Sequence, residues 1–98
     1  MNTVHIQGIT FHRFMLTDYC LKHSVRPNVG VIEAINSYHR FWRANPDKVK
    51  INVNKNNMGT LCKFLVPKEV RDKAKEMAKV HKCAICDVLT ASIDFICS

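Results

Sequence analysis

The side chains best arranged for chemistry are two cysteines close to a histidine, and metal binding is the chemistry that they would support. The stretch HKCAIC at residues 81–86 contains one Cys-x-x-Cys motif, with the histidine two positions before it. Zinc sites need four nitrogen or sulfur ligands in a tetrahedron, and no fourth ligand stands nearby in the sequence. His81, Cys83 and Cys86 are therefore weak metal candidates. We expect cysteines that pack as small apolar residues, and no bound metal.

No other spacing in the chain indicates a catalytic site. The sequence has no glycine-rich phosphate loop, no paired carboxylates and no Ser-His-Asp set. Its five cysteines are an odd number and no secretory signal precedes them, so a disulfide framework is not expected. We therefore expect neither an enzyme nor a cofactor.

The charge of the chain favours an anionic partner. Its net charge is +7, and residues 48–98 carry ten Lys or Arg against five acidic residues, whereas residues 1–47 carry five against three. Lysine dominates the second half, which suits contacts to phosphates better than base-specific recognition. No apolar run approaches the roughly 20 residues of a membrane span, so we expect a soluble cytoplasmic protein.

Residues 60–98 have the clearest secondary-structure pattern. A β-prone run at residues 61–66 ends at Pro67, whose ring suits the first turn of a helix. Residues 68–81 follow with an apolar stripe of helical period, and the pattern breaks near Lys82. It resumes with apolar spacings of 3, 1, 3, 1 and 3 from Ile85 to Ile96, which predicts a second helix. The order is strand, helix, short turn, helix.

The run CKFLVPKEV at residues 62–70, followed by these two helices, resembles ribbon-helix-helix DNA-binding proteins such as the Arc, Mnt and MetJ repressors. The resemblance covers about 38 of the 98 residues. It implies an antiparallel two-stranded ribbon in the major groove, a phosphate at the start of the second helix, and an origin in bacteria, phages or plasmids. The chain departs from the family at the turn between the helices, where Lys82, Cys83 and Ala84 replace the usual glycine and serine. This replacement weakens the expected helix cap.

The first half repeats the same order of predicted elements. Residues 3–7 alternate polar and apolar side chains, and residues 10–23 and 27–42 have helical apolar stripes. A shift of 58 residues superposes the apolar positions of the two halves, and three pairs break the match: Phe14 with Asp72, Gly8 with Val66, and Gly30 with Val88. A unit of about 40 residues rarely buries its apolar faces alone. We therefore expect either an intramolecular pseudo-dimer, which would resemble the relaxosome protein TraY, or a homodimer.

The predicted organisation is a first unit at residues 1–43, a linker or β-arm at residues 44–59, and a ribbon-helix-helix unit at residues 60–98. The predicted fold class is mainly α with a short antiparallel β-ribbon, and two tandem pseudo-repeats in one chain are one of its two expected forms. The middle segment has two interpretations. It is either a polar linker, or Lys48 to Asn54 forms an extra strand that pairs with residues 61–66 as a hairpin.

The strand pattern also predicts the residues that contact DNA. If alternate residues point to the core, the outward set includes Thr3, His5, Gln7, Lys63 and Leu65. The polar members offer donors and acceptors to base edges, and the leucine suits a thymine methyl group. Phosphates would be held by the backbone amides of residues 26–28, which include Asn28, and of residues 84–86, together with the side chains of Arg26 and Lys82.

We expect a small regulator that binds duplex DNA, as a transcriptional repressor or a relaxosome accessory protein. The alternative is a module of phage or plasmid type that binds or inhibits a host protein on the same scaffold. Exposed Leu61 and Leu65 favour that alternative, as does the aromatic end of the first half, which contains Tyr38, Phe41 and Trp42.

Overall fold

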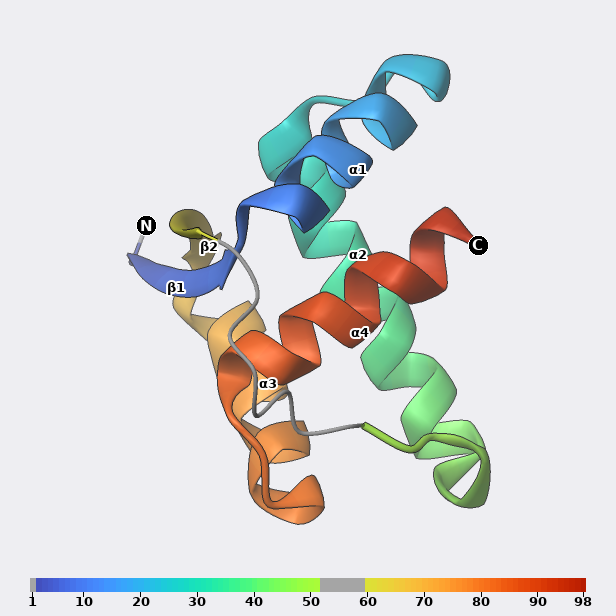
Figure 1. Ribbon diagram of the computed structural model, residues 1–98. Helices are drawn as coiled ribbons and strands as arrows, with labels where there is room; N and C mark the ends of the chain where they lie inside the picture. The colour runs from blue at the N-terminus through green and yellow to red at the C-terminus, as the bar shows by residue number, and fades with distance from the viewer. Residues whose placement is uncertain (1, 52–59) are drawn as a thin grey trace.

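In the computed structural model, the chain folds into the order strand, helix, helix, and then repeats it (Figure 1). The structure describes residues 2–51 and 60–98. The elements are β1 (Thr3–Ile9), α1 (Thr10–Lys22), α2 (Pro27–Ala44), a short 3₁₀ helix η1 (Pro46–Lys48), β2 (Leu61–Pro67), α3 (Lys68–His81) and α4 (Ile85–Cys97). The predicted mainly helical chain with a short antiparallel ribbon is confirmed at this level. None of the helices in the described ranges is long and apolar enough to cross a membrane.

The 58-residue offset of the apolar positions recurs in the elements themselves. The two strands begin at residues 3 and 61, the helices that follow them at residues 10 and 68, and the next helices at residues 27 and 85. Ser24 and Lys82, the described non-glycine residues with positive φ, are also 58 positions apart, with φ of 55° and 54°. Each lies in the turn between the two helices of its half, where a left-handed residue ends the preceding helix.

The two strands pair with each other in an antiparallel ribbon, so each half supplies one strand. Ile6 lies opposite Phe64, and these residues are themselves 58 positions apart, so a local pseudo-two-fold axis passes between them. Both side chains are buried, as is Val66, and the intervening side chains point outward. The predicted strand faces are therefore those of the structure.

The helices of the two halves interlock over one core. The second helices, α2 and α4, pack on each other, while α1 packs on α4 and α3 packs on α2 (Figure 1). The largest fully buried side chains come from all four helices and include Leu16, Ile35, Met77, Leu89 and Ile93. Neither half has a core of its own, because each one covers the apolar faces of the other.

The alternative in which Lys48 to Asn54 forms a hairpin strand is not seen in the part of this segment that the structure describes. Lys48 ends η1, residues 49–51 are not in a strand, and residues 52–54 lie outside the described ranges. The partner of β2 is β1, so the ribbon joins the two halves of the chain. Val49 is buried in the core, so apolar alternation here reflects burial of an irregular segment. The first half also extends to Ala44, one residue beyond the predicted boundary.

The aromatic end of the first half closes the core. Tyr38 and Trp42 are buried on α2, and the rings of Tyr38 and Phe41 pack against Phe95 of α4, with centroids 5.3 and 5.2 Å apart. Tyr38 and Trp42 are thus buried while Phe41 is half-buried, so this aromatic cluster packs mainly into the core.

Candidate nucleic-acid interface

The outward face of the ribbon carries five of the predicted contact residues. His5 lies opposite Leu65 and Gln7 opposite Lys63, while Thr3 lies near the end of the ribbon opposite Pro67. All five predicted side chains are exposed. Because opposite residues of an antiparallel pair stand about 5 Å apart, this face presents a close-set group of hydrogen-bond donors and acceptors.

Two hollows flank the ribbon at equivalent places in the two halves. The first has a volume of about 410 Å³ and is lined by Arg13, by Pro27 and Asn28 at the start of α2, and by β2 residues 63–65. The second, of about 330 Å³, is lined by Arg71, by residues 84–86 at the start of α4, and by β1 residues 5–7. Each lining set contains an arginine of the first helix, the start of the second helix, and the strand of the other half.

The two arginines were not among the predicted contact residues. The guanidinium carbon of Arg13 lies 5.8 Å from the centroid of the Phe64 ring, a cation–π arrangement that holds the side chain beside the ribbon. The Arg71 side chain is partly buried, and its Nε has no hydrogen-bond partner within the described ranges. The signal for this pair was present in the sequence, because Arg13 and Arg71 are aligned by the 58-residue shift.

The starts of the two second helices differ in charge. In α4, the Ala84 amide donates a hydrogen bond to Asp87 Oδ2 at 3.1 Å, so a carboxylate already caps this helix. The first turn of α2 contains no acidic residue. Since negative charge at a helix start competes with a bound anion, the predicted phosphate site is better formed at α2 than at α4. The sequence-based expectation missed this cap because it considered only the position before the helix.

The three predicted phosphate contacts have different positions. Asn28 lines the first hollow together with His5 and Lys63. Arg26 is the exposed residue before α2, and Lys82 is the exposed residue after α3, but neither lines a hollow. The structure therefore brings one of the three together with the ribbon residues.

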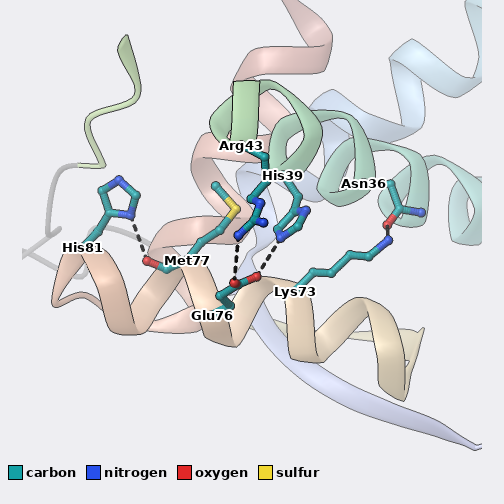
Figure 2. A network of polar contacts seen from close by, with 7 residues as sticks. All are labelled: Asn36, His39, Arg43, Lys73, Glu76, Met77 and His81. Carbon is teal, nitrogen blue, oxygen red and sulfur yellow. Dashed lines mark hydrogen bonds and ion pairs between the residues drawn. The ribbon is translucent and has the colours of Figure 1, made fainter. Parts of the chain in front are cut away.

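The Cys-x-x-Cys motif spans the turn after α3 and the first residues of α4, and both of its cysteines are half-buried. His81 Nδ1 is 2.8 Å from the carbonyl oxygen of Met77, one turn earlier on α3 (Figure 2). Burial raises the pKa of both the Cys83 and the Cys86 thiols, with a further contribution from the nearby Asp87 carboxylate. A raised pKa disfavours the thiolate that binds metals. The described residues contain no group of three or more side chains able to hold a metal ion.

Polar contacts join the two halves away from these hollows. Glu76 of α3 accepts a hydrogen bond from His39 Nε2 at 2.8 Å, and its other carboxylate oxygen lies 3.6 Å from Arg43 Nη1. His39 and Arg43 are both on α2 (Figure 2). Lys73 Nζ donates to Asn36 Oδ1 at 3.0 Å in the same interface (Figure 2). The hydrogen bond from His39 lowers the pKa of Glu76 below its usual 4.5, and the charge of Arg43 adds to this effect.

This pKa shift leads to a pH-dependence prediction. A carboxyl group with a lowered pKa in the folded state stabilises the fold above its ordinary pKa, and the stabilisation disappears as the pH falls through the lowered value. Glu76→Gln should therefore lower the urea midpoint at pH 7, and lower it by less at pH 3. Urea unfolding at both pH values, with exposed Glu33→Gln of α2 as the control, tests this expectation. An equal loss at both pH values would contradict it.

Comparisons with known proteins add no relative: no protein-family model, no curated protein and no solved structure matches the chain.

Proposed function

We propose that this chain is a small DNA-binding regulator of the ribbon-helix-helix class, in which one chain supplies both strands of the ribbon. The observation that supports this proposal is the pair of equivalent hollows beside one exposed polar ribbon face. A two-stranded ribbon fits the major groove of B-DNA, which is about 12 Å wide and has a phosphate backbone on each side. Arginine-lined hollows on both sides of the ribbon suit those two backbones.

Each part of this surface has a role in the proposed complex. Thr3, His5, Gln7 and Lys63 hydrogen-bond to base edges, and Leu65 contacts a thymine methyl group. Arg13 and Arg71 bind phosphates on opposite sides of the groove, because their guanidinium groups form paired hydrogen bonds with phosphate oxygens. Asn28 assists at the first hollow, while Arg26 and Lys82 add positive charge nearby. In the cell the protein acts as a repressor or as a relaxosome accessory.

Salt dependence tests the proposal. Binding to a mixed-sequence duplex should weaken steeply with salt, because contacts to phosphates release counterions. Lys63→Ala should lower the affinity roughly fivefold, equivalent to about 1 kcal/mol. Because the proposed contact of Lys63 is to a base edge, the slope of log affinity against log salt should stay nearly unchanged. A slope flattened by about one unit would assign the lysine to a phosphate instead.

Lys79→Ala is the matched control for this experiment. Lys79 is an exposed lysine of α3 that lines neither hollow, so its loss changes the net charge equally and leaves the proposed surface intact. Lys63→Ala should weaken binding more than Lys79→Ala does. Absence of binding by the unaltered protein at low salt, or equal effects of the two substitutions, would refute the proposed interface.

The second candidate function is a protein-binding module, and the exposed leucines on the ribbon favour it. Leu61 and Leu65 are 43% and 48% exposed on the same face as the polar residues. A stoichiometric protein partner whose binding resists nuclease and salt, together with loss of that partner in Leu65→Ser, would favour this function over DNA binding.

A further inference from the structure

The outer face of α1 is apolar although it lies in solvent. Phe11, Phe14 and Leu21 are 66%, 67% and 76% exposed. Residues separated by three or seven positions lie along one side of a helix, so these three side chains form one stripe. Leu16 and Cys20, which face the core, are buried on the other side of the helix. We call the set Phe11, Phe14 and Leu21 the α1 stripe.

The second half of the chain shows that the fold does not require apolar residues there. The positions 58 residues after the α1 stripe hold Glu69, Asp72 and Lys79, all exposed on α3. The same helix position therefore carries charge in one half and bulky apolar side chains in the other. Packing of the monomer does not explain the α1 stripe.

The chain around the α1 stripe is basic. Residues 2–32 contain three basic residues, Arg13, Lys22 and Arg26, against one acidic residue, Asp18, which gives a net charge of +2 with neutral histidines. Asp18 Oδ2 lies 3.1 Å from Lys22 Nζ, so a neighbouring cation screens this carboxylate. Lys22 and Arg26 are both exposed, at the end of α1 and in the turn that follows it. This part of the surface therefore favours an anionic partner.

The shape of the stripe indicates which anionic partner it suits. The α1 stripe is a ridge on the outside of a helix, and neither hollow beside the ribbon contains one of its residues. The phosphate backbone of DNA offers charged oxygens, which apolar side chains do not bind. An acidic protein would need a groove shaped to this ridge, because the apolar anchors of protein interfaces fill pockets. A bilayer needs no matching groove, since lipids rearrange around separate apolar side chains.

We propose that the α1 stripe inserts into the interface of an anionic lipid bilayer, with α1 parallel to the membrane plane. Interfacial helices bury their apolar face roughly 5–10 Å deep, at the boundary between headgroups and acyl chains. The three stripe side chains occupy that depth, while Lys22 and Arg26 stay level with the lipid phosphates. This inference goes beyond the proposed DNA-binding function and does not rest on it.

The attachment is reversible and depends on the charge of the lipids. Even a single myristoyl chain gives only marginal membrane binding, roughly 10⁴ M⁻¹, so three side chains do not anchor the protein by themselves. Each apolar side chain that leaves water strengthens binding roughly fivefold, and each Lys or Arg near an anionic surface does about the same. Association therefore requires both the stripe and anionic headgroups.

Sedimentation with lipid vesicles tests the inference. The full chain is mixed at low salt with vesicles of phosphatidylcholine alone, or with vesicles in which about one third of the lipid is phosphatidylglycerol. The unaltered protein should partition about 25-fold more strongly into the anionic vesicles, because Lys22 and Arg26 each contribute roughly fivefold.

The variant Phe11→Gln, Phe14→Gln, Leu21→Gln removes the apolar side chains and keeps the net charge. Its partitioning into the anionic vesicles should fall about 100-fold, since three contributions of roughly fivefold are lost. The control Val80→Gln changes an exposed apolar residue of α3 in the same way and should partition like the unaltered protein. Both variants should keep the urea midpoint of the unaltered protein, because α3 carries polar side chains at the positions equivalent to the stripe.

A tryptophan placed in the stripe separates insertion from attraction by charge alone. The natural Trp42 is buried, at 8% exposed, so it contributes the same background to every variant. The emission of Leu21→Trp should shift to shorter wavelength with anionic vesicles, because an indole at the membrane interface leaves water. The emission of Val80→Trp should stay unchanged. Adhesion of the basic ribbon face to lipid phosphates would shift neither variant.

Four results would overturn the inference. The first is partitioning of the unaltered protein that is absent or equal for neutral and anionic vesicles. The second is equal partitioning of the triple variant and its control, and the third is an unshifted emission of Leu21→Trp on vesicles that bind it. The fourth is a stripe-dependent dimer in lipid-free solution, measured as solution mass, which would assign the stripe to a second copy. Binding to duplex DNA, or its absence, changes none of these outcomes.

Discussion

Leu89→Ala is expected to lower the free energy of unfolding by about 2–5 kcal/mol, the range for leucines truncated in a packed core. Leu89 is 0% exposed. Its helix, α4, contacts β1 and the other three helices, so this side chain lies where the two halves meet. It also packs closely over β1, since a Cβ added to Gly8 would come within 2.6 Å of Leu89 Cδ2. Truncation would leave a cavity between the ribbon and the helices, and neither can move to fill it without losing its other contacts.

Urea unfolding at neutral pH measures this loss, and Leu21→Ala is the matched control. Leu21 is 76% exposed, so the same substitution there should change the free energy of unfolding by less than about 0.5 kcal/mol. A similar loss at both positions would contradict a single core shared by the two halves.

Gly30→Val is expected to cost about 1–3 kcal/mol, because the added side chain overfills a packed site. Gly30 is buried on α2, and a Cβ at this position would overlap the Cys20 sulfur. In the other half the equivalent positions hold Val88 and Ala78, both buried. The two halves therefore fill this pair of positions with a similar total side-chain volume in different ways. The first half uses glycine and cysteine, and the second uses valine and alanine.

The double variant Cys20→Ala, Gly30→Val tests this exchange of volume. It installs the side chains of the second half in the first, so it should recover most of the stability that Gly30→Val loses. A double-mutant cycle with Cys20→Ala should give a favourable coupling energy above about 1 kcal/mol, as neighbouring residues often do. Additive losses would contradict the proposed equivalence of the two sites.

The elements were predictable because their signals are local. The alternation in residues 3–7 and 61–66, the stripes of the four helices, and the prolines at helix starts each depend on residues only a few positions apart. Burial then followed from the pattern: Ile6 and Phe64 are inside, while His5 and Lys63 are outside. Five of the predicted contact residues therefore lie together on the ribbon face.

Other features depend on contacts that local patterns do not encode. Val49 has the same alternation as a strand residue, yet it is buried in an irregular segment because β1 already pairs with β2. The cap of α4 by Asp87 uses a side chain inside the helix. The hollows with Arg13 and Arg71 form where the strand of one half meets the helices of the other.

The sequence by itself determined which side chains each strand and helix turns toward apolar partners, because that choice follows from periods of two and 3.6 residues. It also contained the 58-residue correspondence of the halves. Only the tertiary structure decided that the halves interlock through a shared ribbon, that equivalent hollows flank the ribbon, and that one apolar helix face stays in solvent. These features depend on which distant segments pack together, and local periodicity carries no record of that choice.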